Sequence, residues 1–176
     1  MSRLSDIDPG PKCPISVRMI VEIPKNSANK YEYDIALGVF KLDRTLYAPM
    51  HYPGDYGFIP GTMAEDGDPI DIVALVDEPS FSGCMMEVRP VGILEMEDNA
   101  AIDRKILAVP VRNPRYDLIH GMDDVQPHVR KEIEHFFEIY KELEEKVVKT
   151  RGWRDADAAH EAIRSSRERY LAKLKA

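Results

Sequence analysis

Two patterns of hydrophobic residues divide the chain into a first part that predicts strands and a last part that predicts helices. Apolar and polar side chains alternate from Ile15 to Ile23, with Ile15, Val17, Met19, Val21 and Ile23 on one face. A period of two is typical of a half-buried strand. Further candidate strands are 30–34, 40–42, 70–76, 85–96 and 102–111, separated by turns rich in Gly and Pro. Many short strands at this spacing predict a small sandwich or barrel.

The last part changes to helical spacing. Apolar residues recur at steps of three and four from Val129 to Val147, namely Val129, Ile133, Phe136, Phe137, Tyr140, Leu143 and Val147. Asp155 or Asp157 is placed to cap a second helix, whose apolar side is Ala159, Ile163, Tyr170 and Leu174. Gly152-Trp153 is assigned to the connection between these helices. No linker separates strands from helices, so we expect a single α+β domain over 1–176, with 1–14 a loosely ordered N-terminal segment.

Composition narrows the class of protein. The 176 residues include 31 acidic and 24 basic side chains, which gives a net charge of −7. This charge opposes binding to nucleic acid, and it opposes binding to a membrane surface through a polybasic patch. Two distant cysteines, Cys13 and Cys84, are not a disulfide framework. No apolar run approaches the ~20 residues that span a bilayer. We therefore expect a cytoplasmic protein with no nucleic-acid or membrane partner.

The most informative segment is Asp66-Gly67-Asp68-Pro69-Ile70-Asp71. Three carboxylates within six residues repel one another, and a divalent cation relieves that repulsion. Hard oxygen ligands favour magnesium, manganese or calcium. A solvated acidic turn is the alternative, and an EF-hand fits less well because the Pro intrudes and the later Glu is missing.

Other charged residues extend this pattern. Asp98 and Asp103 flank a hairpin-like loop, and Asp103 shares a strand face with Lys105. Lys30 and Glu32 share a strand face by the same rule. Arg44 follows a strand, and Lys141 follows Tyr140 near the helix. Carboxylates that hold metal ions, mixed with bases, are suited to a highly charged phosphate, although each base alone is more often a solvated surface charge.

The sequence also contains an aromatic segment and lacks several common catalytic motifs. His51 to Pro60 interleaves Tyr and Gly, which can place phenol hydroxyls beside a ligand. For Tyr52 and Phe58 we prefer packing in a buried turn. No Walker loop, dinucleotide-binding glycine motif or nucleophile elbow is present, and the five histidines show no zinc-ligand spacing.

Together these segments resemble the soluble, family I inorganic pyrophosphatases of bacterial type. The matching segments, in the family's order, are Val21-Glu22-Ile23-Pro24, Lys30-Tyr31-Glu32, Asp43-Arg44, Tyr52-Pro53-Gly54-Asp55-Tyr56-Gly57, Asp66-Gly67-Asp68-Pro69-Ile70-Asp71, Arg89-Pro90-Val91-Gly92, Asp98 through Lys105, His135-Phe136-Phe137 and Tyr140-Lys141. The resemblance covers most of the chain. It implies a five-stranded, OB-like closed barrel with two C-terminal helices packed beside it.

The resemblance also implies residue roles. Metal ions would be held by Asp66, Asp71, Asp98, Asp103 and Glu32, with Glu22 supporting their water shell. Asp68 would orient and deprotonate the attacking water. The phosphoryl groups would be bound by Lys30, Arg44, Tyr56, Lys105, Tyr140 and Lys141. Several Mg²⁺ ions would act in each site, with Mn²⁺ or Zn²⁺ able to substitute, and bacterial relatives are typically homohexamers.

The expected activity is magnesium-dependent hydrolysis of inorganic pyrophosphate to two orthophosphates by direct attack of a metal-activated water. Two alternatives stay open on the sequence. One is a non-catalytic OB-like module that binds calcium or an oligonucleotide, although the net charge of −7 opposes the oligonucleotide. The other is a hydrolase of larger phosphoanhydrides such as nucleoside triphosphates, for which the chain offers no recognisable base-binding motif.

Overall fold

The computed structural model describes residues 3–175, which form mostly strands with two longer helices. The strands are β1 (Val17–Ile23), β2 (Asn29–Asp34), β3 (Val39–Thr45), β4 (Asp55–Phe58), β5 (Asp71–Ala74), β6 (Met85–Asp98), β7 (Ala101–Pro110) and β8 (Val148–Arg154). The helices are α1 (Pro127–Ile139) and α2 (Ala156–Lys175). Short 3-10 turns lie at Leu4–Asp6, Pro114–Tyr116, Met122–Asp124 and Glu142–Glu144.

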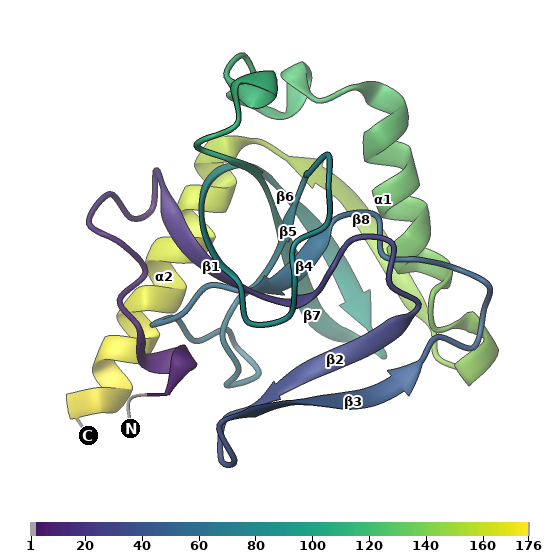
Figure 1. The fold of residues 1–176 in the computed structure, drawn as a ribbon, viewed down its shortest axis with the longest axis horizontal. Coiled ribbons are helices and arrows are strands. Elements are labelled where there is room, and N and C mark those ends of the chain that lie inside the picture. The colour runs from purple at the N-terminus through teal and green to yellow at the C-terminus, as the bar shows by residue number, and fades with distance from the viewer. Residues whose placement is uncertain (1–2, 176) are drawn as a thin grey trace.

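Five strands close into a ring in the order β1-β4-β5-β7-β6, and β6 pairs back onto β1 (Figure 1). Closure is antiparallel, with Val17 opposite Val88 and Ile20 opposite Met85. Strands β5 and β7 run parallel, whereas β8 adds to β6 outside the ring. Strands β2 and β3 form a separate hairpin that projects from the barrel. The predicted α+β architecture, a five-stranded barrel with two C-terminal helices beside it, is confirmed.

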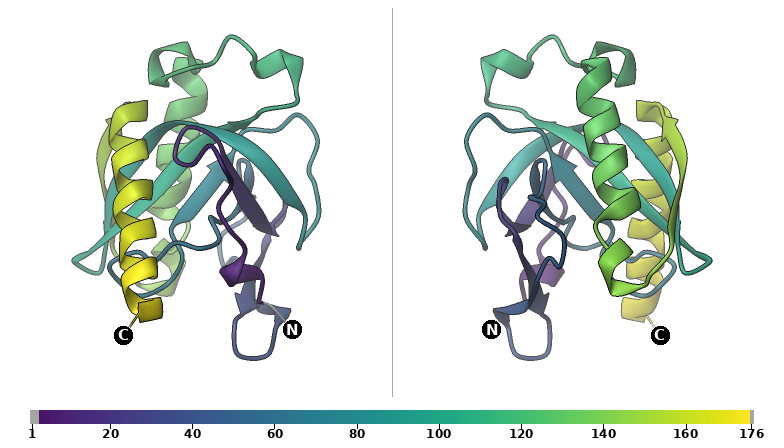
Figure 2. Two further views of the ribbon diagram at one scale, coloured as in Figure 1. Left: turned by 90° about the vertical axis from the view of Figure 1, so that its left-hand side faces the viewer. Right: turned by 90° about the vertical axis from the view of Figure 1, so that its right-hand side faces the viewer.

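The barrel strands are buried on both faces, which explains their long apolar runs. On β5 and β7, Val73 and Leu107 join the core cluster that contains α1, whereas Ile72 and Ile106 join the cluster that contains α2. Figure 2 shows both helices lying alongside the strands. Alternate side chains therefore pack against different helices, and polar residues at the strand ends are left to face the solvent-accessible rim.

The first helix is shorter than its apolar spacing predicts. We expected it to continue to Val147, but it ends at Ile139, and Leu143 and Val147 are each 61% exposed. Glu145 has a left-handed φ of 58°, which no α-helix accommodates. Gly152-Trp153 lies between the two helices, as predicted, but both residues belong to a strand that was not predicted, β8, with Trp153 opposite Leu94. Strand β8 pairs with the edge of β6 over Ile93–Asp98. A longer helix would leave the backbone N–H and C=O groups on this edge of β6 unpaired.

The aromatic segment contains a strand that the sequence pattern did not predict. Strand β4 crosses β1 closely enough that a Cβ on Gly57 would lie 1.9 Å from the Ile20 carbonyl oxygen, so only glycine fits. At its start, the fully buried Asp55 carboxylate accepts hydrogen bonds from the backbone N–H groups of Lys25 (2.8 Å) and Ser80 (3.1 Å). Tyr52 and Phe58 are 2% and 4% exposed, so the two rings pack in the core as predicted.

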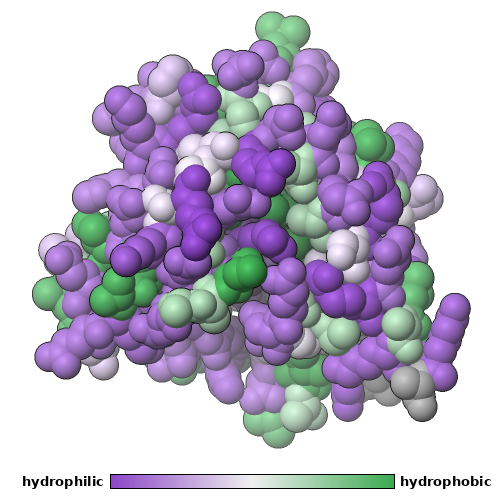
Figure 3. All heavy atoms as spheres, turned by 180° about the vertical axis from the view of Figure 1, so that it is seen from behind, coloured by the Kyte–Doolittle hydropathy of each residue, from purple (hydrophilic) through white to green (hydrophobic). Residues whose placement is uncertain are grey.

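The two ends of the chain meet along α2. Asp155 accepts a hydrogen bond from the Ala158 N–H (3.0 Å) and caps the helix, as predicted, whereas Ile15 and Leu174 are exposed instead of buried. The Tyr170 hydroxyl donates to the Asp6 carboxylate in the N-terminal segment (3.1 Å). Within residues 3–175 no helix has the length and apolarity needed to cross a membrane. The face in Figure 3 is mostly hydrophilic, with scattered apolar spots.

Candidate active site

The acidic segment is a compact loop between β4 and β5. The Asp68 N–H donates to the Asp66 carboxylate (3.0 Å), and the Ala64 N–H donates to the Asp68 carbonyl (2.7 Å). Gly67 supplies a φ of +95°, which lets the loop reverse between the two aspartates. The buried Thr62 hydroxyl accepts from the Ile70 N–H (3.1 Å) and closes the base of the loop. The loop backbone is thus held by its own hydrogen bonds while its carboxylates remain available.

A lysine links this loop to the neighbouring strand. Parallel pairing sets Asp71 of β5 opposite Lys105 of β7, and the Lys105 ammonium lies 2.7 Å from Asp103 and in close contact with Asp71. Lys105 is only 4% exposed. Burial opposes its charge, but the two carboxylates outweigh this effect and raise the lysine pKa above its ordinary value. Asp103 and Lys105 share a face, as predicted.

The β6–β7 hairpin brings Asp98 to the same face. Asp103 lies opposite Met96, and Asp98 is two residues further along β6, so its side chain points to the same side of the sheet. Residues 99 and 100 both have positive φ, which suits the tight turn. One Asp98 oxygen pairs with the Lys141 ammonium at the end of α1, whereas Oδ1 is buried with no hydrogen-bond partner among the described residues.

The β2–β3 hairpin supplies a second group of paired charges. Lys30 lies opposite Arg44 across the hairpin and pairs with Glu32 and with Asp43, the latter at 3.3 Å. Arg44 pairs with Asp43 and, through Nε at 2.7 Å, with Glu144 beyond α1. Asp43 and Glu144 were not predicted as part of the site. Asp43 could have been found as the acidic neighbour of Arg44, whereas no local signal connects Glu144 to it.

These elements enclose a cleft of about 420 Å³. Its lining residues are Glu22, Lys30, Tyr31, Glu32, Tyr33, Ile35, Tyr56, Phe58, Asp66, Asp68, Pro69, Asp71, Asp103, Lys105, Tyr140 and Lys141. Eleven of the thirteen predicted site residues are among them. The other two, Arg44 and Asp98, lie just outside and are tied to lining residues through Asp43 and Lys141. Tyr31 and Tyr33, which were not predicted as site residues, also line the cleft.

Burial, with the charges of neighbouring carboxylates, raises the pKa values of several carboxyl groups in the cleft. Burial raises the pKa of Glu22 to about 8, and the negative charge of Asp71 raises it further. A hydrogen bond from the Tyr33 N–H (2.7 Å) lowers this pKa but does not offset the burial. Loss of hydration raises the pKa of Asp68, and the neighbouring charges of Asp66 and Asp71 add to it. Perturbed titratable groups in a cleft mark it as a candidate active site.

The cleft carries more negative than positive groups. Six carboxyl groups face only three lysines, and each lysine is already paired with a carboxylate. No three His, Cys, Asp or Glu side chains converge on one point as a finished metal site anywhere in 3–175. The donor set nevertheless fits a hard divalent cation, because it consists of carboxylate oxygens and includes the unpartnered Asp98 Oδ1. An additional cation would relieve the repulsion between these groups.

Stability of the metal-free protein is expected to fall as pH rises from about 4.5 to about 8. In the folded protein Glu22 keeps its proton up to a pH of about 8. In the unfolded chain the same carboxyl group has a pKa of 4.5 and has already released the proton. The loss is up to roughly 5 kcal/mol at about 1.4 kcal/mol per pKa unit. Urea unfolding with EDTA, compared between wild type and Glu22→Gln at each pH, measures it. Glu142→Gln on the exposed surface is the control. Identical pH dependence of wild type and Glu22→Gln would contradict the assignment.

Comparison with known proteins identifies this arrangement. The profile of the family described as inorganic pyrophosphatase matches residues 19–171. The inorganic pyrophosphatase of Thermus thermophilus is 49% identical over 173 residues, 97% of this chain and 99% of that protein. That of Methanosarcina mazei is 48% identical over 157 residues, covering 89% and 93%.

Solved structures agree. The crystal structure of the Thermus thermophilus inorganic pyrophosphatase superposes with a TM-score of 0.94 at 47% identity, covering 97% of this chain and 99% of that one. The Coxiella burnetii structure gives 0.89 at 42% identity, covering 93% and 99%. The chain belongs to the inorganic pyrophosphatase family, as a family I member of the bacterial type. It is accordingly an enzyme, a hydrolase of pyrophosphate, which confirms the resemblance and the predicted class of enzyme.

Proposed function

We propose that this chain hydrolyses inorganic pyrophosphate to two orthophosphates in the cleft described above, with Mg²⁺ as its metal and with Asp68 as the residue that orients and deprotonates the attacking water. The single observation that carries the proposal is the cleft itself, where six carboxyl groups surround three lysines. Such a site repels a bare polyanion and accepts one that arrives with divalent cations. Competing uses, as a calcium module or a nucleotide hydrolase, gain no specific support from the fold.

The carboxylates divide into two roles. Asp66, Asp71, Asp98, Asp103 and Glu32 would hold the metal ions, and Glu22 would support their water shell. When bound, Mg²⁺ supplies positive charge to the phosphoryl oxygens and lowers the pKa of a coordinated water. Manganese or zinc is expected to substitute for magnesium.

Asp68 is suited to accept a proton from the attacking water. Its raised pKa brings it closer to the working pH than an ordinary aspartate, which favours general-base action. Its backbone is fixed at both the N–H and the carbonyl, so the carboxylate is offered from a defined position. A direct attack by this water needs no covalent enzyme intermediate.

Basic and phenolic groups would bind the two phosphoryl groups. Lys30 and Arg44 approach from the β2–β3 hairpin, Lys105 and Tyr56 from the barrel, and Tyr140 and Lys141 from the end of α1. Lysines that lose a carboxylate partner to a metal ion would be released to donate to phosphate oxygens. These donors would neutralise charge that moves onto the leaving phosphate.

Cytoplasmic location and assembly into a homohexamer are part of the same proposal. Both rest on the likeness to the inorganic pyrophosphatase family.

A phosphate-release assay tests the proposal directly. The purified chain is expected to release phosphate from pyrophosphate with MgCl₂ and to lose activity in EDTA, with recovery when Mg²⁺ is restored. ATP is the control substrate and is expected to be cleaved far more slowly. Magnesium binding without phosphate release would favour a non-catalytic module, and equal rates on ATP would favour a broader phosphoanhydride hydrolase.

A further inference from the structure

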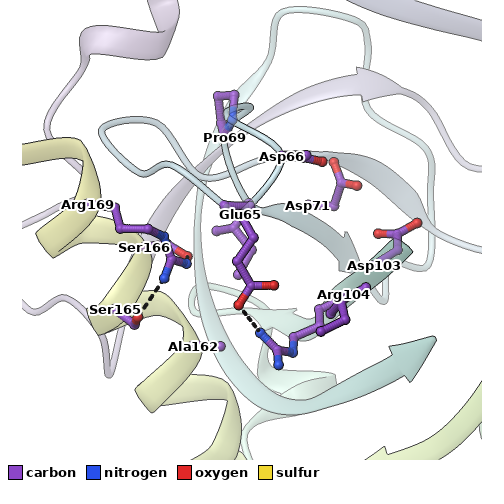
Figure 4. Close-up of a pocket in the computed structure, with 13 residues that line it drawn as sticks. Glu65, Asp66, Pro69, Asp71, Asp103, Arg104, Ala162, Ser165, Ser166 and Arg169 are labelled. Carbon is purple, nitrogen blue, oxygen red and sulfur yellow. Dashed lines mark hydrogen bonds and ion pairs between the residues drawn. The ribbon is translucent and has the colours of Figure 1, made fainter. Parts of the chain in front are cut away.

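Helix α2 touches the back of the acidic loop. The Met63 N–H donates to the Ser166 carbonyl (2.9 Å), and the Met63 carbonyl accepts from Arg169 Nε (2.9 Å). Both polar groups of one loop residue are therefore bound by the C-terminal helix. Figure 4 shows Arg169 and Ser165 on the helix side of the loop, opposite Asp66, Asp71 and Asp103.

The arginine is itself held rigidly. Its Nη1 donates to the Ser165 hydroxyl (2.8 Å) and its Nη2 to the Ser166 hydroxyl (3.1 Å), which lie four and three residues earlier on the helix. Those spacings place all three side chains on one helix face. Ser166 is 1% exposed, so its hydroxyl is a fixed partner. A planar guanidinium bound at three nitrogens leaves Nε with a single direction toward the loop.

One peptide group carries this restraint to Asp68. The carbonyl of Met63 and the N–H of Ala64 belong to the same planar unit, so fixing the direction of one fixes the other. Arg169 binds the carbonyl, and the Ala64 N–H donates to the Asp68 carbonyl at 2.7 Å. The path from the helix to Asp68 thus consists of two hydrogen bonds joined by a rigid plane.

We propose that Arg169 is a positioning residue for hydrolysis, which acts through the Met63–Ala64 peptide to fix the backbone of Asp68 relative to the neighbouring carboxylates. This role rests on the proposed function of Asp68. Arg169 itself does not line the cleft. A small displacement of a general base lowers turnover more than it lowers substrate affinity, because alignment matters most in the transition state.

The test compares Arg169→Met with Arg164→Met. Arg164 lies on the exposed surface of the same helix, where it pairs with Glu161, so it controls for loss of an arginine. We expect Arg169→Met to lower kcat at least tenfold well below its melting temperature, with KM changed less than threefold. Arg169→Lys should recover part of the loss, because its ammonium can still donate to the Met63 carbonyl. Arg164→Met should match wild type.

Amide hydrogen exchange on the metal-free protein gives a readout that needs no activity. Exchange at Ala64 is expected to be at least tenfold faster in Arg169→Met than in wild type, and unchanged in Arg164→Met. A lower melting temperature with unchanged kcat and unchanged Ala64 exchange would show a merely structural role and overturn the proposal. If Arg169→Met does not fold, the same two measurements on Arg169→Lys decide.

Failure of the proposed function gives a different pattern. If Asp68→Asn retains wild-type turnover while Arg169→Met accelerates Ala64 exchange, the helix still restrains the loop but Asp68 is not the general base, and the positioning role for hydrolysis is overturned with it. If Asp68→Asn is inactive and Arg169→Met leaves kcat and exchange unchanged, the proposed function stands and only the positioning role is lost.

Discussion

Replacing Asp68 with Asn is expected to lower kcat for pyrophosphate by about 10²- to 10⁴-fold, the usual contribution of a positioned general base. The amide has nearly the same shape but cannot take a proton. The backbone bonds to Ala64 and Asp66 do not involve the Asp68 side chain, so the loop is expected to keep its form. Steady-state phosphate release at saturating Mg²⁺ measures the change, and isothermal titration measures magnesium affinity, which is expected to shift only a few-fold.

Glu65→Gln is the matched control for this change. Glu65 is an exposed carboxyl group on the same loop, paired with Arg104 at 3.1 Å (Figure 4), and it does not line the cleft. It should keep nearly full turnover. An Asp68→Asn enzyme with turnover within a few-fold of wild type would remove Asp68 as the proton acceptor.

The second large effect is on stability. Lys105→Met is expected to destabilise the metal-free protein by about 3–5 kcal/mol, the range found when one partner of a buried ion pair is removed. Lys105 is 4% exposed, and its removal leaves Asp71 and Asp103 facing each other without a cation. Added Mg²⁺ is expected to restore part of the loss, because a divalent ion can take over the neutralising role.

Urea unfolding in EDTA and in MgCl₂ measures both effects. Lys149→Met on β8 is the control, since its side chain is exposed and surface substitutions usually change stability by less than 0.5 kcal/mol. A Lys105→Met protein as stable as wild type in EDTA would contradict the account of Lys105 as the cation that holds the two aspartates together.

The strands with strong alternation or continuous apolar runs were predictable from sequence, and so was the capping of α2 by Asp155. Strand β4 was not, because its four residues include Gly57, which lowers strand propensity and is needed only because β1 passes so close. Strand β8 was hidden by Val147, which extends a helical pattern by coincidence. This segment forms a strand because it pairs with the open edge of β6, which lies fifty or more residues earlier in the sequence.

The grouping of the candidate residues in one cleft was predictable only where local spacing alone makes them neighbours. Lys30 with Glu32, and Asp103 with Lys105, are neighbours by the period of a strand alone. The pairing of Arg44 with Glu144 spans one hundred residues and has no local signature. Links of this kind depend on where α1 ends, which the apolar pattern placed incorrectly.

The closed ring of strands has a consequence for how the enzyme is inactivated. Tyr56, Asp71 and Lys105 lie on three adjacent strands of the barrel, β4, β5 and β7. The pairing of β6 with β1 closes the barrel. Loss of any one strand opens the barrel, so a partly unfolded barrel does not keep these three side chains together. Catalysis on heating should therefore disappear together with the barrel in one cooperative event, and residual activity should count the intact molecules in a sample.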